Sequence, residues 1–418
     1  MLHVKSMISN SLFFVICVST PVQAAEYFSI QDLNYEGASR FLDVVAGESR
    51  LGFANGTFAI DETQESIFIV GHEQHQAIAE YKLNGFSESN ELNDLPMAEP
   101  TIQEYSKVLN RASGGNPEKI DTITGLAFIN GKLVVNASKF YDAGGSNNDT
   151  TLIINNPDDI KNSVIEGYFE LEAANHAAGW MTPIPFNLRQ TFEADYIFGF
   201  SSNLPINARN SMGPSAFAVD SQNFLSPDPE KKIKTVPLLD FSVSNPLHED
   251  TYNETGENEL FTELSKAFVG FIVPGTQTYA VFGFSAGHEY GIGYKIQQDT
   301  GATCPGPCAK VASDRYNYYW LWDINDFLSV KNGQALPHEV KPYEYGRLDL
   351  PFEGSDPKNG NGPHVLTAAY YDFDNQMLYF LLGEADRIQS AYEDHPILLK
   401  FSINLGQSPS APTNIRID

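Results

Sequence analysis

The chain has 418 residues, with 26 Lys and Arg against 53 Asp and Glu, which gives a formal net charge of −27 at pH 7. A chain this acidic is not expected to present a surface that binds nucleic acid or an anionic membrane. It is typical of exported proteins that must stay soluble in salt, and it does not by itself indicate a polyanionic substrate.

The first residues have the pattern of a cleaved signal peptide. Lys5 precedes an apolar run at 12–18, and the small-residue segment 22–24 ends in an Ala that a signal peptidase accepts. The run is too short to cross a bilayer, and no later segment has the roughly 18 consecutive apolar residues that a membrane helix needs. We therefore expect a signal peptide at 1–24, no membrane span, and a secreted or periplasmic mature protein.

Strand-like segments recur through the rest of the chain. Paired segments predict three hairpins, at 58–61 with 67–71, 125–128 with 133–135, and 368–372 with 377–383. The second pair turns at Asn130-Gly131, a strong two-residue hairpin signal. Further strands are predicted at 196–200, 279–283 and 318–323. Helical periodicity is confined to a turn or two at 324–330 and within 158–178.

Hairpins separated by long Gly-, Asn-, Ser- and Pro-rich connections favour four-stranded blades repeated around an axis. We expect an all-β fold in which residues 25–418 form a single β-propeller of about seven blades. The last strand, at 397–401, is expected to pair near the mature N-terminus and close the ring. A β-helix or two β-sandwiches would give the same periodicity and stay open as alternatives.

The cysteines predict a structural element. Cys17 leaves with the signal peptide, and Cys304 and Cys308 belong to the segment Cys-Pro-Gly-Pro-Cys. In an oxidising compartment a disulfide is the plainer interpretation. The alternative is a structural zinc held with His288, for which no fourth ligand can be named.

No nucleophile elbow, phosphate-binding loop, dinucleotide fingerprint or His-Glu-x-x-His motif is present. Instead, polar and aromatic clusters stand where strands meet long loops, the usual place for a propeller site. Their candidate ligand-facing residues are His72, Asn136, Tyr141, His176, Asn207 and Arg209. Each has a structural alternative: a solvated histidine, a turn, an internal hydrogen bond, or an arginine paired with an acid.

Six segments together resemble a known family. Residues 71–80, 141–143, 179–181, 209–217, 322–327 and 339–343 are similar in order to the secreted seven-bladed ulvan lyases. The resemblance covers most of the mature chain. It implies β-elimination at a uronic acid of a sulfated algal polysaccharide, in which an Arg neutralises the carboxylate and His or Tyr side chains move protons.

The resemblance also implies roles for particular residues. Arg209 would neutralise the carboxylate, and Tyr252 would act as acid and base, with Tyr196 as another candidate. The paired histidines of the family are missing from 120–160, so either His72 or His176 would replace them in space, or a Tyr would act alone as base and acid. The structural metal of the family would correspond to His288, Cys304 and Cys308, with one ligand lacking.

The sequence thus predicts a monomeric polysaccharide lyase that acts on a uronate-containing glycan without a catalytic cofactor. The alternative is a non-catalytic glycan-binding or surface-interaction propeller. A calcium-dependent hydrolase is a third class, although the acids are scattered without ligand spacing. Fold alone does not decide among them.

Overall fold

The computed structural model describes residues 27–405, except 143, 145, 203–210, 225–226, 229–230, 358–359 and 391. Nearly all regular structure in this part is β. One four-stranded unit consists of β2 (Phe58–Asp61), β3 (Ser66–Val70), β4 (Ala77–Lys82) and β5 (Met97–Lys107). The next consists of β6 (Thr122–Ile129), β7 (Lys132–Ser138), β8 (Asp149–Ile154) and β9 (Ile165–Glu170).

Three more units complete the set. The third is β10 (Met181–Pro183), β11 (Tyr196–Phe198), β12 (Ala216–Val219) and β13 (Val236–Leu239). The fourth is β14 (Lys266–Ile272), β15 (Thr278–Ala286), β18 (Arg315–Asp323) and β19 (Glu344–Arg347). The fifth is β20 (Leu366–Asp372), β21 (Met377–Asp386), β22 (His395–Ile403) and β1 (Leu33–Phe41).

Smaller elements decorate these units. A short hairpin is formed by β16 (Ile292–Tyr294) and β17 (Pro307–Ala309). The α-helices among the described residues are α1 (Phe186–Phe192) and α2 (Ile324–Lys331). Single 3₁₀ turns lie at Ile30–Asp32, Leu92–Asp94, Leu109–Arg111, Pro157–Asp159, Ala174–Ala177 and Ser221–Phe224. No helix in the described ranges is long and apolar enough to cross a membrane.

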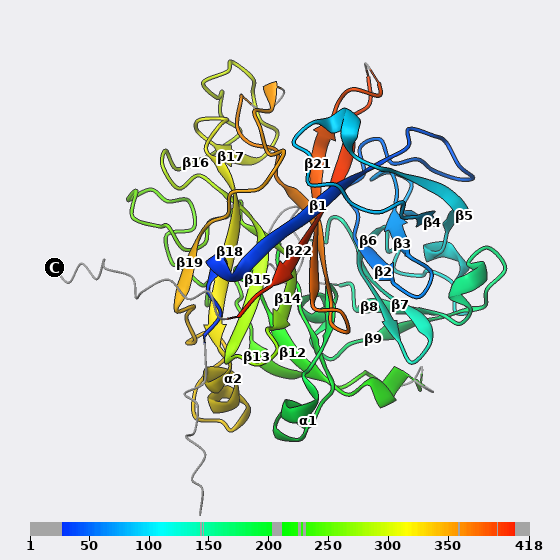
Figure 1. Ribbon diagram of the computed structural model, residues 1–418. Helices are drawn as coiled ribbons and strands as arrows, with labels where there is room; N and C mark the ends of the chain where they lie inside the picture. Colours follow the sequence, from blue (N-terminus) through cyan, green and yellow to red (C-terminus); the bar gives the residue numbers. More distant parts are fainter. Residues whose placement is uncertain are drawn as a thin grey trace, which may run out of the picture.

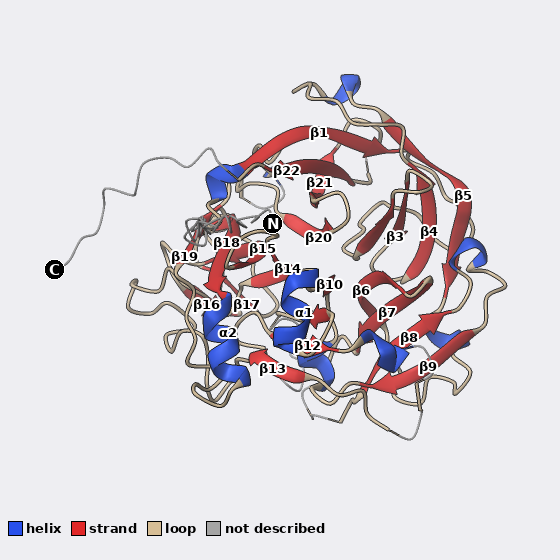
Figure 2. Ribbon diagram, turned by 60° about the horizontal axis from the view of Figure 1, so that its bottom comes forward, coloured by secondary structure: helices blue, strands red, loops and turns tan. Residues whose placement is uncertain are grey.

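The units stand as blades around one axis (Figure 2). The first strands of consecutive blades touch in a closed circle, from β2 to β6, β10, β14, β20 and back to β2. Apolar side chains fill the space between each pair of neighbouring blades, as five separate clusters. Because a blade packs on both faces, β3 is buried along its whole length without polar alternation. The protein is therefore a β-propeller.

The ring closes as expected from the last predicted strand. β22 pairs antiparallel with β1, from Leu33 opposite Ile403 to Ser39 opposite Leu398. The end of β1 also pairs, in parallel, with the beginning of β5 in the first blade. The first strand of the described chain thus joins the last blade to the first (Figure 1).

The predicted hairpins are confirmed as β2–β3, β6–β7 and β20–β21. Asn130 and Gly131 both have positive φ, as a two-residue hairpin of the predicted type requires. The expected number of blades was wrong, since the described residues form five. Much of the remaining chain lies in long connections, among them 42–57, 240–265, 287–314 and 348–365.

These long connections share one end of the propeller. Each either precedes the first strand of a blade or joins a second strand to a third, so all meet at the end where the first strands begin. The opposite end carries the short turns 62–65, 130–131 and 373–376, together with α1 and α2. In Figure 1 the β16–β17 hairpin and the two helices accordingly lie at opposite ends of the molecule.

Candidate active site

A cavity of about 760 Å³ opens at the end with the long connections. Its wall contains residues at or just before the first strands of the blades, including Asn55, Ile123, Lys266 and Leu366. A smaller hollow beneath it, of about 80 Å³, shares Lys266 and reaches Trp180 before β10. Residues of four blades line the larger cavity, and the third blade contributes only to the smaller hollow, so the two together lie around the propeller axis.

Two cations of the fourth blade face this cavity. Lys266 begins β14, and Arg315 begins β18 two strands away in the same sheet. Burial alone lowers the pKa of Lys266 to about 8. Burial also lowers the pKa of Arg315, although the nearby carboxylates of Asp356 and Glu384 act in the opposite direction and raise it. No carboxylate of the described residues forms an ion pair with Lys266. An ammonium left without a counter-ion at the floor of a cavity is a binding point for an anion.

His364 stands in the connection before β20 and also lines the cavity. Its ring is buried, and its Nδ1 has no hydrogen-bond partner among the described residues. Burial lowers the pKa of His364, and this effect is larger than the opposite effect of the Asp356 charge, which raises the pKa. A neutral imidazole in the wall of a cavity can accept a proton from a bound molecule.

The acids of the cavity are engaged in the surrounding structure. Asp356 pairs with Arg387 at 2.7 Å, and Glu384 lies 3.5 Å from the same guanidinium. Asn55 Nδ2 donates to Glu73 Oε2 at 2.9 Å, and the Phe140 N–H donates to Asp121 Oδ1 at 2.6 Å. These contacts leave Lys266 and Arg315 as the cavity's cations with no described ion-pair partner.

Aromatic rings supply the apolar part of the wall. Phe268 follows Lys266 in β14, with the ammonium 5.1 Å from its ring centre, and Phe284 packs against Phe268 from β15. Phe140 lines the opposite side, in the connection after β7. Exposed rings beside polar groups are suited to stacking on the apolar faces of sugar rings.

A separate cavity of about 440 Å³ lies at the other end of the axis. It is lined by the turns after β2 and β20 and by Tyr196 of β11. Burial, reinforced by the charge of Asp195, raises the pKa of Tyr196 to about 12. Because Tyr196 faces the far end, it does not share a site with Lys266, and its predicted catalytic role is not placed at the larger cavity.

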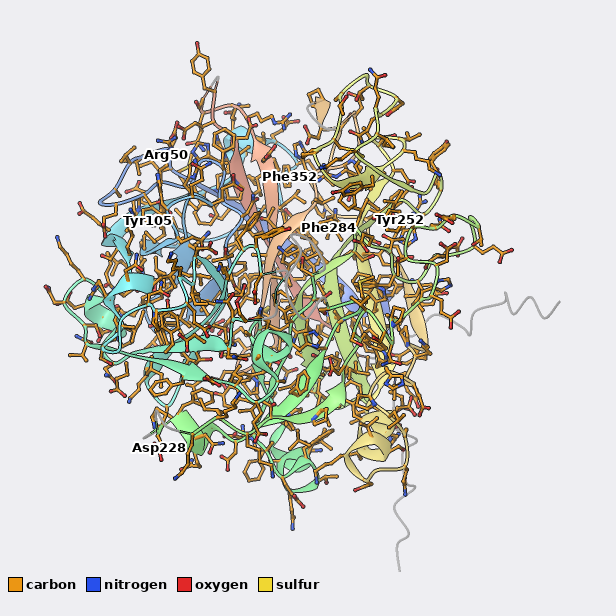
Figure 3. The ribbon with its side chains drawn as sticks, turned by 180° about the vertical axis from the view of Figure 1, so that it is seen from behind. Arg50, Tyr105, Asp228, Tyr252, Phe284 and Phe352 are labelled. Carbon is orange, nitrogen blue, oxygen red and sulfur yellow. A yellow bond between two sulfur atoms is a disulfide. The ribbon has the colours of Figure 1, made fainter. Side chains whose placement is uncertain are left out.

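The other predicted catalytic residues also stand apart from the larger cavity's lining. His72 stacks on His75 and packs against Phe53. His176 lies in the 3₁₀ turn before β10, where Nδ1 pairs with Asp240. Tyr252 belongs to the connection between β13 and β14, farther toward the edge of the molecule than Phe284 in Figure 3.

The predicted substrate-binding residues have different outcomes. Asn136 is fully buried, where its Nδ2 donates to the Gly179 carbonyl at 3.0 Å and its Oδ1 accepts from Thr151 Oγ1 at 2.9 Å. It therefore joins two blades and does not face the cavity. Tyr141 is exposed next to Phe140 but is not part of the cavity wall. Arg209 and Asn207 lie outside the described residues.

The close approach of these blades explains a glycine pair. A Cβ on Gly125 would lie 1.9 Å from the Gly179 carbonyl oxygen, which no side chain tolerates. Gly125 of β6 and Gly179 before β10 thus let neighbouring blades meet next to the axis, where Asn136 holds them together.

The metal site expected from His288, Cys304 and Cys308 is not formed. The two cysteines are joined by a disulfide, so neither offers a thiolate. His288 Nδ1 lies 2.7 Å from the Asn258 carbonyl and therefore donates to it, while Nε2 accepts from Ser285 Oγ at 2.7 Å. With both nitrogens engaged, His288 is a structural residue stacked on Tyr318.

The disulfide closes a very short loop in the β16–β17 hairpin, so its effect should be small. We expect replacement of both cysteines by serine to lower the free energy of unfolding by no more than about 2 kcal/mol, because short loops gain least from cross-linking. Urea denaturation of the two proteins measures the difference. A larger loss would show that the hairpin contributes to the stability of the whole propeller.

Sequence reasoning missed Lys266, Arg315 and His364. Lys266 stands at the polar edge of an apolar strand, an ordinary position until the strand is known to start a blade. The signal that could have found it is a single basic residue at the first position of an innermost strand. Arg315 and His364 are far apart in sequence, and only the ring brings them together.

Comparisons with known proteins leave the family open. No protein-family profile matches the chain, and no curated protein matches its sequence. Among solved structures, a quinohemoprotein alcohol dehydrogenase from Pseudomonas putida is similar over 87% of this chain and 62% of its own, at 10% identity and a TM-score of 0.28. The chain therefore spans less than two thirds of that protein. A likeness this distant carries no argument about function.

Proposed function

We propose that this protein is a polysaccharide lyase whose axial cavity binds a uronate-containing glycan. One observation carries the proposal: the ammonium of Lys266, without a described counter-ion, at the floor of a cavity with aromatic walls. A sugar carboxylate fits this cation, and the rings of Phe268 and Phe284 fit the face of the sugar.

In this proposal Lys266 and Arg315 neutralise the uronate carboxylate, which makes the C5 proton acidic. His364, whose neutral ring lines the cavity, takes that proton. The electron pair of the C5–H bond forms the C4–C5 double bond, and the bond from C4 to the glycosidic oxygen breaks. The imidazolium can return its proton to the leaving oxygen, so that one histidine serves both steps.

The test is absorbance of the unsaturated uronate when the purified protein is mixed with ulvan, alginate and pectin in turn. We expect the absorbance to rise with at least one of them. His364→Gln should lower the rate about 100-fold or more while substrate binding persists, because the amide cannot take up the proton. The control His338→Gln changes a histidine outside the cavity and should leave the rate unchanged.

A glycan-binding protein without catalysis is the alternative, favoured by the engagement of the cavity's carboxylates in structural contacts. Binding of the glycan without any unsaturated product would support this alternative and contradict the lyase.

The lowered pKa of Lys266 predicts how affinity depends on pH. Lys266 is charged below about pH 8 and loses its proton as the pH rises through that value. Affinity for an acidic oligosaccharide should therefore be full at neutral pH and fall above about pH 8, with binding itself moving the midpoint upward. Calorimetric titration across this range measures it. A flat profile, or affinity that rises with pH, would remove Lys266 from the binding site.

A further inference from the structure

Three potential metal ligands meet beside the ring closure, outside the cavity described above. Asp43 follows the end of β1, Glu393 lies in the connection from β21 to β22, and His395 begins β22. One ligand atom from each falls within 4.8 Å of the others. None of the three lines the axial cavity.

The histidine is the buried member of this group. The His395 side chain is 0% exposed, and neither ring nitrogen has a hydrogen bond to any described residue. Nε2 nevertheless lies 3.2 Å from Asp43 Oδ1. The two atoms are close, but the contact does not have the geometry of a hydrogen bond. A buried imidazole with two unengaged nitrogens is costly unless a further group satisfies it.

Glu393 also has a buried polar atom without a hydrogen-bond partner. Its Oε1 lies 3.0 Å from Arg50 Nε, while its Oε2 is buried without a hydrogen bond. The ion pair with Arg50 orients the carboxylate and leaves one oxygen uncommitted. Such a partner behind a carboxylate is typical of metal ligands.

The separation of His395 from Asp43 suits a four-coordinate transition metal, and the separations from Glu393 are no more than 4.8 Å. With metal–ligand distances of about 2.0–2.1 Å, neighbouring ligand atoms of a tetrahedral zinc site lie roughly 3.3 Å apart. The 3.2 Å between His395 Nε2 and Asp43 Oδ1 is close to that edge. An imidazole ligand favours zinc over calcium or magnesium, which prefer oxygen ligands alone.

We propose that Asp43, Glu393 and His395 form a zinc site, with solvent in the fourth position. The site joins the segment after β1 to the beginning of β22, the two strands that close the ring. Bound zinc would therefore stabilise the closed propeller, since the ligands come together only when these strands are paired. The inference does not depend on the proposed lyase activity.

The experiment is calorimetric titration of the chelator-treated, untagged protein with zinc, followed by thermal unfolding with and without the metal. We expect one zinc per chain and a higher Tm when zinc is bound. Asp43→Asn, at an exposed position, should fold and weaken zinc binding about 10-fold or more. His395→Gln should do the same, and His338→Gln should bind zinc as the unchanged protein does.

Saturable binding that disappears in Asp43→Asn supports the site even if His395→Gln fails to fold. Three results would overturn it: no saturable zinc binding, unchanged affinity in Asp43→Asn, or tighter binding of calcium than of zinc at these residues.

Discussion

Lys266→Met should lower kcat/KM on a uronate polysaccharide by about 100-fold or more, because a preorganised charge opposite the developing negative charge is lost. The same change should leave the Tm unchanged or raise it. Lys266 carries a charge within the protein without a described carboxylate partner, and methionine fills a similar volume without the cost of burying that charge.

Opposite effects on activity and stability separate a binding role from a structural one. Enzyme kinetics and thermal unfolding of the same samples provide both readings. Lys295→Met is the matched control, because Lys295 is exposed over the Tyr294 ring and should change neither quantity. If Lys266→Met lowered the Tm and left kcat/KM per folded molecule intact, Lys266 would be a structural residue.

Asp386→Ala should have the largest effect on stability. Arg40 of β1 donates to both carboxylate oxygens of Asp386 at the end of β21, at 2.8 and 3.2 Å. Both side chains are buried, and Gln389 also donates to this carboxylate. Removing Asp386 leaves a buried guanidinium without its counter-ion, which costs about 3–5 kcal/mol. That is a large share of the 5–15 kcal/mol by which a folded domain is usually stable.

Chemical denaturation measures this loss against two comparisons. Glu289→Ala breaks the exposed pair with Arg347 and should cost less than about 1 kcal/mol. The double variant Arg40→Met with Asp386→Leu should recover much of the loss, because it removes both charges together. An Asp386→Ala protein as stable as the unchanged one would mean that this pair does not hold β1 in the last blade.

The fold could largely be predicted because its signals are local. Alternating turns and apolar runs identified the hairpins β2–β3 and β20–β21, and the position of the last strand indicated its pairing with β1. The number of blades could not be predicted in this way. A connection such as 287–314 carries a hairpin of its own, and its sequence resembles part of a blade until β15 and β18 are seen to pair directly.

The candidate site was much less predictable, because it depends on which side chains are buried and on which residues, distant in sequence, the ring brings together. Asn136 looked available for a ligand, but its Nδ2 donates to the next blade and its Oδ1 accepts from Thr151 of its own blade. Tyr196 begins a strand, β11, yet faces the other end of the axis. Lys266 draws no attention in the sequence, and its lowered pKa arises only when the blades surround it.

The most direct test of the account is calorimetric titration of the protein with a uronate oligosaccharide and with the same oligosaccharide after its carboxylates have been reduced to alcohols. The account predicts binding of the acidic form at neutral pH, loss of binding for the reduced form, and weak binding of both by Lys266→Met. Equal affinity of the unchanged protein for the two forms would contradict the claim that the axial cavity recognises a sugar carboxylate through Lys266.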